Sequence, residues 1–451
     1  MEAAVAEKEF SPLARTALRA PRQVKLRVNV LWSLAGAGVY SLCQLGILVV
    51  LAKLGTHEML GQFALGLAIA TPVMISAGLS SLRIVQATDA RADHRFEDYL
   101  ALRLVTTVGG LAVVAGILFF TTYSATTKGV VLVVAVAKAI ENLSDVFGGL
   151  LQHHERMDLL AVSAMLRGTL SLLAMAIGLY FSGDVLVAVA CLALSWALTL
   201  TFFDARVSAA LWGAPTDASS IATALKSVGN LLQPPWNWPA LAAIGTLGLP
   251  VIIATALVSI TINIPRYFIE HFLGIGELGK FAALAYIMAA GVTVINALGQ
   301  SVMPRLAHQY ADGEWQRFSA LVVTLTGVAT ALGVIGVTLI QFAGRPILTL
   351  LYRPEYASYI SLFLLLGVGT AVFLVSGILG YAVNAVRHFR AQMFVSILVA
   401  LLAMAACRAL VPRWHLIGAA VAIILTAAFQ AAANATVILY ALRSKLKQAE
   451  I

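Results

Sequence analysis

Charged residues are scarce in this chain, and their scarcity excludes most soluble folds. Of its 451 residues, only 11% are Asp, Glu, Lys or Arg, whereas 60% are hydrophobic. Soluble globular domains average about 25% charged and about 45–50% apolar residues. The composition therefore predicts a polytopic membrane protein. Its net charge of +9 indicates a fixed orientation and contact with anionic membrane lipids, not nucleic acid binding.

Patterns typical of metal sites and catalytic centres are also missing. The three cysteines, Cys43, Cys191 and Cys407, lie in apolar stretches and offer neither a disulfide framework nor the spacing of metal ligands. The sequence contains no HExxH and no P-loop motif. Enzymes that act on lipid-linked sugars normally need a large external loop, and every expected outward connection here is short. The sequence therefore predicts neither an enzyme nor a bound cofactor.

Long apolar stretches dominate the chain, and a helix needs about 20 such residues to cross a bilayer. We expect twelve spans, at 28–52, 60–82, 102–122, 129–151, 159–181, 184–205, 249–271, 278–303, 318–342, 358–384, 389–411 and 416–442. Lys and Arg are more than twice as frequent on the side that would hold both termini, which places both termini in the cytoplasm. The expected divisions are a basic tail (1–27), an N-lobe (28–205), an interfacial linker (206–248), a C-lobe (249–442) and a cytoplasmic tail (443–451).

The two halves of the chain resemble each other. Residues 61–64, Gly-Gln-Phe-Ala, match residues 279–282, Gly-Lys-Phe-Ala, at an offset of 218 (61 to 279). Six spans per half is an even number, so the two repeats would share one topology and be related by an axis along the membrane normal. The sequence thus predicts an all-α protein of two six-helix lobes.

The linker between the halves has the pattern of an amphipathic helix. Apolar residues recur at helical spacing over 221–232, followed by Trp236 and Trp238. Such a helix lies in the membrane interface. The prolines at 234, 235 and 239 are expected to break it, so that it tethers the halves while letting them move.

The expected span 129–151 carries Lys138, Glu141, Asn142 and Asp145 near its middle. On a helix these four positions fall on one face, within about 100° of one another. A charge near the bilayer centre costs about 2.5–3.5 kcal/mol, so this face must pair its charges or border a water-filled space. Pairing of Lys138 with Glu141 is the structural alternative, but it leaves Asp145 unsatisfied. The span therefore predicts a polar interior within the membrane.

Two arginines lie inside later spans. Arg167 is expected to face Glu141 or Asp145 from the fifth span, which makes the cluster formally neutral and leaves both a structural network and a cation-coupling site open. Arg266 follows Asn263 within the seventh span. An arginine there either meets an anion or water, or extends to the outer membrane interface.

The remaining polar candidates are amides and one further arginine. Asn296 and Gln300 share one face of the eighth span, and Gln430 and Asn434 share one face of the twelfth. Each pair would line a polar path or join helices through hydrogen bonds. Arg83, at the cytoplasmic end of the second span, would meet a phosphate or an anionic lipid headgroup.

The run 61–64, the helix end 79–83 followed by Asp89, and above all the stretch 263–281 resemble the polysaccharide flippases of the MOP exporter superfamily, the Wzx-type transporters of O-antigen and capsule repeat units. The resemblance covers the whole chain in topology. It implies two six-helix lobes that form a V around a central cavity. It also implies that the chain moves undecaprenyl-diphosphate-linked oligosaccharides across a bacterial inner membrane by alternating access.

The same resemblance implies roles and partners. Arg266 and Arg83 would bind the diphosphate, and Lys138 with its carboxylate neighbours would line the cavity. The implied partners are the lipid-linked glycan, membrane lipids, a coupling cation such as H⁺ or Na⁺ at Glu141 or Asp145, and proteins of polysaccharide polymerisation or assembly.

Three alternatives remain open from the sequence. A cation-coupled multidrug antiporter of the same superfamily usually has an acidic residue in its first or seventh span, whereas this chain has only Glu270, at the outer end of the seventh. A lipid II flippase shares the lipid-diphosphate substrate but commonly has extra spans and several early arginines. A membrane scaffold for glycan assembly would not need its intramembrane charges.

Overall fold

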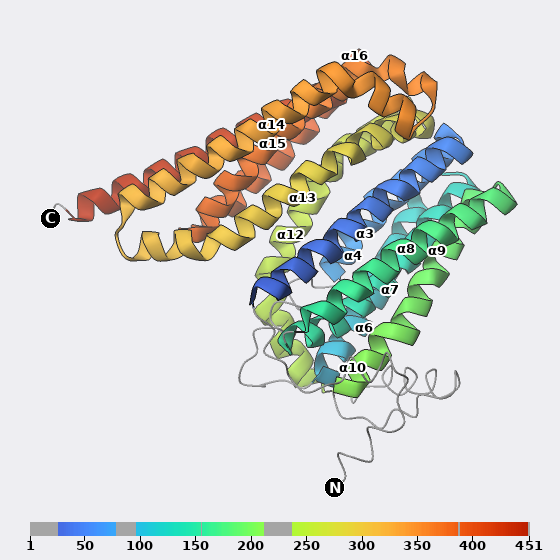
Figure 1. Ribbon diagram of the computed structural model, residues 1–451, viewed down its shortest axis with the longest axis horizontal. Coiled ribbons are helices and arrows are strands. Elements are labelled where there is room, and N and C mark those ends of the chain that lie inside the picture. The colour runs from blue at the N-terminus through green and yellow to red at the C-terminus, as the bar shows by residue number, and fades with distance from the viewer. Residues whose placement is uncertain (1–25, 78–95, 155, 212–236, 387, 450–451) are drawn as a thin grey trace, which may run out of the picture. The chain divides into compact units, whose positions relative to one another are not determined.

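The computed structural model describes residues 26–77, 96–154, 156–211, 237–386 and 388–449, and these residues are helical apart from short connections. They form two compact units (Figure 1). The first unit contains the described residues up to Gly55 and from Gly66 to Ala256. The second contains Thr56–Leu65 and everything from Leu257 onward. The first unit thus includes described residues 237–256, which the sequence assigned to the linker and the start of the C-lobe, and the second unit includes Thr56–Leu65 from the expected N-lobe.

Six long helices precede residues 212–236, which lie outside the described residues. They are α3 (Leu26–Leu54), α4 (His57–Ala77), α6 (Phe96–Phe120), α7 (Ala125–His153), α8 (Met157–Ser182) and α9 (Val185–Thr199). A one-turn π-helix, η1 (Leu200–Asp204), joins α9 to the short helix α10 (Ala205–Leu211). The helix α10 thus ends six residues beyond the expected end of the N-lobe at 205.

The second half begins with α12 (Trp238–Leu273) and α13 (Ile275–Ala311). They are followed by α14 (Trp315–Leu351), the short 3₁₀ helix η2 (Pro354–Tyr359), α15 (Ile360–Ala385) and α16 (Phe389–Ala449). The backbone of α16 breaks at His415, whose φ is 52°, so this long element is two helices joined at a kink. Six helical segments therefore make up this half as well.

Nine helices in the described residues are long and apolar enough to cross a membrane by length and composition. The helix α7 is not among them because Lys138, Glu141 and Asp145 interrupt its apolar character. With α7, α12 and the second segment of α16, the long helices in the described residues number twelve, six in each half, apart from the short elements α10, η1 and η2. The predicted fold class, an all-α polytopic membrane protein, is confirmed.

Local chemistry sets several helix ends. Ser124 accepts a hydrogen bond from the Thr127 amide at the start of α7, and Asp184 accepts one from the Leu186 amide at the start of α9. These side chains satisfy amide groups that a first helical turn leaves unpaired. Gly183, with φ of 63°, ends α8 in a left-handed conformation that favours glycine.

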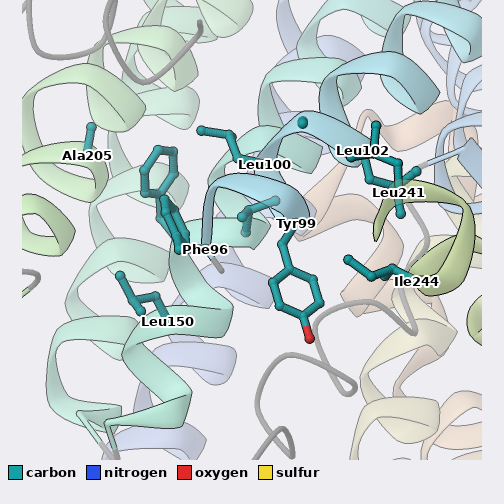
Figure 2. Packing of buried hydrophobic residues seen from close by; sticks show 11 residues of the cluster. Phe96, Tyr99, Leu100, Leu102, Leu150, Ala205, Leu241 and Ile244 are labelled. Atoms are coloured by element: carbon teal, nitrogen blue, oxygen red, sulfur yellow. The ribbon is translucent and has the colours of Figure 1, made fainter. Parts of the chain in front are cut away.

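Small residues let helices of the first unit approach closely. A Cβ atom on Gly36 of α3 would lie 2.8 Å from the Ala161 Cα on α8, and one on Gly168 would lie 3.2 Å from the Cys43 Cβ. Such small-residue contacts are typical of helix packing in membranes. A separate cluster of buried hydrophobic residues, including Phe96, Phe147 and Leu241, joins α6, α7 and the start of α12 (Figure 2).

Two glycines of the internal repeat meet within the second unit. A side chain on Gly61 would collide with the carbonyl of Ile275, and one on Gly279 would collide with the carbonyl of His57. The offset of 218 that relates Gly61 to Gly279 also relates His57 to Ile275. Each segment therefore contacts the other through equivalent positions, as happens across a twofold axis. This contact supports the internal repeat that the sequence predicted.

His57, at the start of α4, contacts two residues of η2. Its Nδ1 lies 3.1 Å from the hydroxyl of Tyr356, and its Nε2 lies 3.2 Å from a carboxylate oxygen of Glu355. The side chain of Tyr356 is fully buried. These contacts explain why residues 56–65 belong to the second unit although α4 continues into the first.

The helix that contains the expected seventh span begins before the predicted start of that span. The sequence placed it at 249, after a linker in which Pro239 breaks a helix. In the structure α12 already begins at Trp238, and Pro239 lies in its first turn, where a missing amide hydrogen removes no helical hydrogen bond. The proposed amphipathic stretch 221–232 lies outside the described residues.

Candidate functional site

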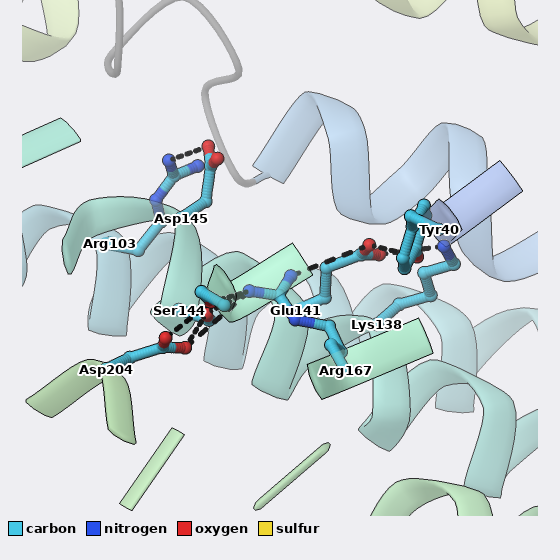
Figure 3. Close-up of polar contacts among 9 residues, drawn as sticks. Tyr40, Arg103, Lys138, Glu141, Ser144, Asp145, Arg167 and Asp204 are labelled. Atoms are coloured by element: carbon cyan, nitrogen blue, oxygen red, sulfur yellow. Dashed lines mark hydrogen bonds and ion pairs between the residues drawn. The ribbon is translucent and has the colours of Figure 1, made fainter. Parts of the chain in front are cut away.

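The charged face of α7 lies at the centre of a polar network in the first unit (Figure 3). Lys138 donates a hydrogen bond from Nζ to the Glu141 Oε2 at 2.8 Å, the i, i+3 pair that the sequence offered as the structural alternative. The hydroxyl of Tyr40 on α3 donates to the other oxygen of Glu141 at 2.9 Å. The Lys138 ammonium also lies 5.4 Å from the ring centre of Trp196 on α9. Three helices therefore meet at these two charges.

Arg167 on α8 bridges two carboxylates. Its Nη1 lies 3.9 Å from the Glu141 Oε1, and its Nη2 lies 3.6 Å from the Asp204 Oδ2 (Figure 3). Glu141 is one of the two neighbours that the sequence proposed for Arg167, whereas Asp204 was not foreseen. The side chain of Asp204 is only 3% exposed. It receives hydrogen bonds from the hydroxyls of Ser144 and Ser163, so both of its oxygens are engaged.

The π-helix η1 carries Asp204 at its last position. A π-helical turn contains an extra residue, so side chains beyond it rotate relative to those before it, and such turns often occur at functional sites. Because η1 comes directly after the apolar helix α9, it delivers a carboxylate to the interior of the first unit. The sequence shows only an aspartate at the expected end of a span.

Asp145, which the sequence left without a partner, is held by Arg103 on α6. The Arg103 Nη2 donates to the Asp145 Oδ2 at 3.0 Å, and the Arg103 side chain is 1% exposed. Asn142 donates from Nδ2 to the backbone carbonyl of Met74 on α4 at 2.8 Å. The four polar residues of α7 therefore contact five different helices, α3, α4, α6, α8 and α9, which fixes the rotation of α7 in the unit.

Two cavities border this network inside the first unit. One, of about 370 Å³, lies among residues of α3, α7 and α8 and reaches Asp204. The other, of about 390 Å³, is lined by residues of α3, α4, α6, α7 and α8, including Lys138, Glu141 and Asn142. Tyr40, Asp145, Ala164 and Arg167 line both cavities. The charged face of α7 therefore borders open space within the unit and is not packed against its neighbours along its whole length.

Charge in the network is balanced overall but not locally. Lys138, Arg103 and Arg167 face Glu141, Asp145 and Asp204, so cations and carboxylates are equal in number. The larger cavity is lined by all three cations and two carboxylates, whereas the smaller one is lined by Arg167, Asp145 and Asp204. A surplus of positive charge therefore faces one cavity, and a surplus of negative charge faces the other.

Arg266 has different surroundings, in the second unit. Its Nη1 donates to the Asn263 Oδ1 at 2.6 Å, and its guanidinium carbon lies 5.8 Å from the ring centre of Tyr286 on α13. Asn263 is buried and in turn donates to the Ser259 carbonyl. Among the described residues no carboxylate pairs with Arg266. The described partners of its guanidinium, Asn263 and Tyr286, are both uncharged side chains.

The amide pairs of the second unit act in part as contacts between helices. Asn434 on α16 is fully buried and donates to the Ser376 carbonyl on α15 at 3.3 Å. Asn296 on α13 accepts a hydrogen bond of 3.4 Å from the hydroxyl of Tyr381 on α15. Gln430 is half-buried one turn before Asn434. Arg83 and the side chain of Gln300 lie outside the described part of the structure.

Sequence reasoning missed Arg103 and Asp204. Both lie at expected span ends, at 102–122 and 184–205, where a charge ordinarily faces water and lipid headgroups. A count of charges along the α7 face did give a signal, because the pairing of Lys138 with Glu141 left Asp145 without a cation. Only the packing of α6 and η1 against α7 identifies the partners.

Comparison with known proteins places this arrangement in a known fold. No protein-family model matches the chain. The capsular polysaccharide biosynthesis protein CapF of Staphylococcus aureus is 25% identical over 385 residues, which cover 85% of this chain and 91% of that protein. This relative is a capsule biosynthesis protein by name, and the alignment spans nearly all of both chains.

Solved structures share the fold at low sequence identity. The inward-facing conformation of a multidrug resistance MATE family transporter of the MOP superfamily matches with a TM-score of 0.69 at 12% identity, over 93% of this chain and all of that one. A MOP superfamily transporter from Pyrococcus furiosus matches with a TM-score of 0.61 at 15% identity, over 98% of this chain and all of that one. The chain is therefore a multi-pass membrane protein with the fold of these transporters, which is the fold that the sequence resemblance implied.

Proposed function

We propose that this protein is a flippase that moves undecaprenyl-diphosphate-linked oligosaccharides across a bacterial inner membrane for surface polysaccharide synthesis. The observation that carries the proposal is the pair of cavities in the first unit. They are large enough for water and are lined by ion-paired side chains, within an otherwise apolar helical unit that has a transporter fold. The similarity to a capsule biosynthesis protein over 85% of the chain supports a glycan as cargo. A hydrophilic headgroup needs such a path, because hydrocarbon offers it no hydrogen bonds.

Arg266 is the residue that we assign to the diphosphate. Its guanidinium is oriented by Asn263 and Tyr286 without being neutralised, and a planar guanidinium binds phosphate oxygens in a bidentate way. Lys138 is a weaker candidate because it already forms an ion pair with Glu141 at 2.8 Å. Arg83 keeps its proposed phosphate role from the sequence alone.

Both termini are proposed to face the cytoplasm, where the substrate is assembled. The conformational change is proposed to be driven by an ion gradient, with Glu141 and Asp145 as the candidate carboxylates. Each is about a quarter exposed and already held by a cation, so binding of H⁺ or Na⁺ would require Lys138 or Arg103 to move away. Proteins of polysaccharide polymerisation would receive the translocated glycan.

Binding of the purified full-length protein to undecaprenyl diphosphate tests the assignment. Replacing Arg266 by glutamine removes a charge-assisted contact, which contributes about 1.5–3 kcal/mol, and should weaken binding roughly 10- to 150-fold. Arg345→Gln is the matched control, since Arg345 is an exposed arginine on α14. Equal affinities of the wild-type protein and Arg266→Gln for this lipid would contradict the role of Arg266.

The runner-up function is export of cationic drugs. Two observations favour it: solved structures with the same fold are described as multidrug transporters, and carboxylates outnumber cations around the smaller cavity. Transport into proteoliposomes separates the two functions. A flippase moves lipid-linked glycan and leaves ethidium outside, whereas a drug exporter moves ethidium and has no effect on the lipid.

A further inference from the structure

The smaller cavity of the first unit has the dimensions of a small-ligand site. Its volume of about 370 Å³ lies near the lower end of the range of about 300–1,000 Å³ for such sites. Small residues on three helices make the room. They are Gly36 and Ala37 on α3, Gly148 on α7, and Ala161 and Ala164 on α8. Larger side chains, including Tyr40, Leu151 and Leu160, complete its wall.

The polar part of its lining offers both hydrogen-bond donors and acceptors. Gln152 contributes an amide, which has both, and Ser33 contributes a hydroxyl whose proton is donated to the Asn29 carbonyl at 2.9 Å. That bond leaves the Ser33 oxygen as an acceptor. Tyr40 adds an aromatic ring, while its own hydroxyl is directed to Glu141. A ligand suited to this wall carries several groups that both donate and accept.

The charge around this cavity excludes a phosphate. Its ionisable residues are Arg167, Asp145 and Asp204, so carboxylates outnumber cations. The one guanidinium is already shared between Glu141 and Asp204, at 3.9 Å and 3.6 Å. A diphosphate entering here would meet repulsion without a free counter-charge. An uncharged polyhydroxyl compound would not, because a sugar hydroxyl both donates to carboxylates and accepts from amides.

We propose that this cavity is a sugar-binding subsite, which holds one or two uncharged sugar residues of the lipid-linked glycan apart from its diphosphate. The proposal rests on the proposed flippase function. It adds a second site, which binds the uncharged sugar, to the site that binds the charged diphosphate. Gln152 and Ser33 contact the sugar, and the network of Arg167 and Asp204 forms the rigid floor of the subsite. The diphosphate is recognised elsewhere, by residues with surplus positive charge.

The test compares probes that share the lipid diphosphate and differ in the sugar. They are undecaprenyl diphosphate alone and the same lipid carrying one glucose, galactose, N-acetylglucosamine or N-acetylgalactosamine. Equilibrium binding is measured on the full-length protein in lipid nanodiscs. Ala37→Phe fills the cavity, and Ala35→Phe is the matched control on the same helix, because Ala35 is exposed and does not line the cavity. Gln152→Ala removes a polar contact without adding bulk.

The wild-type protein should bind at least one glycosylated probe roughly tenfold or more tightly than the bare lipid. Ala37→Phe and Gln152→Ala should reduce that preference to near unity, Ala35→Phe should retain it, and the affinity for the bare lipid should stay constant in all variants. A wild-type protein that prefers no glycosylated probe, or an Ala37→Phe variant that retains the preference, overturns the subsite while the flippase function stands. Failure of every lipid to bind overturns both.

Discussion

Replacing Arg167 by glutamine removes the only cation that the described residues place beside Asp204. The carboxylate, 3% exposed, would keep the hydroxyl contacts of Ser144 and Ser163 but lose its counter-charge at 3.6 Å. Removing one partner of a buried ion pair costs about 3–5 kcal/mol, since it leaves an uncompensated buried charge. We therefore expect Arg167→Gln to be severely destabilised.

The reverse change should be milder. In Asp204→Asn, Arg167 retains Glu141 at 3.9 Å, and the asparagine oxygen still accepts from a serine. The loss is then of the order of one or two neutral hydrogen bonds, about 1–2 kcal/mol. Combining both changes removes the charge from each partner, so the double variant should be more stable than Arg167→Gln alone.

Thermal stability of the purified proteins, followed by size-exclusion chromatography after heating, measures this order. About 1 kcal/mol corresponds to roughly 2–4 °C for a domain of this size, so Arg167→Gln should lose roughly 6–20 °C and Asp204→Asn only a few degrees. Equal losses in the two single variants would refute the argument, as would a double variant no more stable than Arg167→Gln. Transport by a stable double variant would show that the pair is structural.

Three further results are expected. Gly279→Val should prevent accumulation of folded protein because its side chain would collide with the His57 carbonyl, whereas Gly276→Val, with open space at its Cβ, should accumulate normally; membrane yield distinguishes them. Tyr352→Phe removes the 2.8 Å hydrogen bond to the buried Ala283 carbonyl and should lower stability by about 1–2 kcal/mol, measured as a shift in melting temperature. Glu141→Gln should change the dependence of glycan export on the ion gradient, measured with ionophores, and an unchanged dependence would exclude Glu141 from coupling.

The residues within a helix were easier to place than the ends of helices. The apolar lengths of α6 and α8, 25 and 26 residues, predicted these helices directly, because a bilayer requires about 20 apolar residues. The helix α12 begins at Trp238, eleven residues before the expected span start at 249, although Pro239 looks like a helix breaker in sequence. In the structure it occupies the first turn, where proline is tolerated.

The internal repeat shows how a weak sequence signal gains physical meaning. The match of residues 61–64 with 279–282 consists of a few small and apolar residues, which recur by chance in membrane helices. Side chains on Gly61 and Gly279 would collide with backbone carbonyls. Two helix backbones meet there, so both positions require glycine. Sequence alone cannot distinguish such a glycine from Gly109, which has open space around its Cβ.

The sequence by itself determined that this chain is a twelve-helix membrane protein and that the face of α7 bearing Lys138 is polar. Apolar length predicts the helices, helical spacing places the polar residues of α7 on one face, and the high cost of a charge in hydrocarbon means that this face needs polar surroundings. The sequence also proposed the contacts of Glu141 with Lys138 and Arg167, whereas only the tertiary structure identified Arg103 and Asp204 as members of the network. Arg103 and Asp204 stand far from α7 in sequence and look like ordinary charges at span ends. Ion pairing depends on distances of a few ångströms between helices, and those distances are set by how α6, α8 and η1 pack around α7.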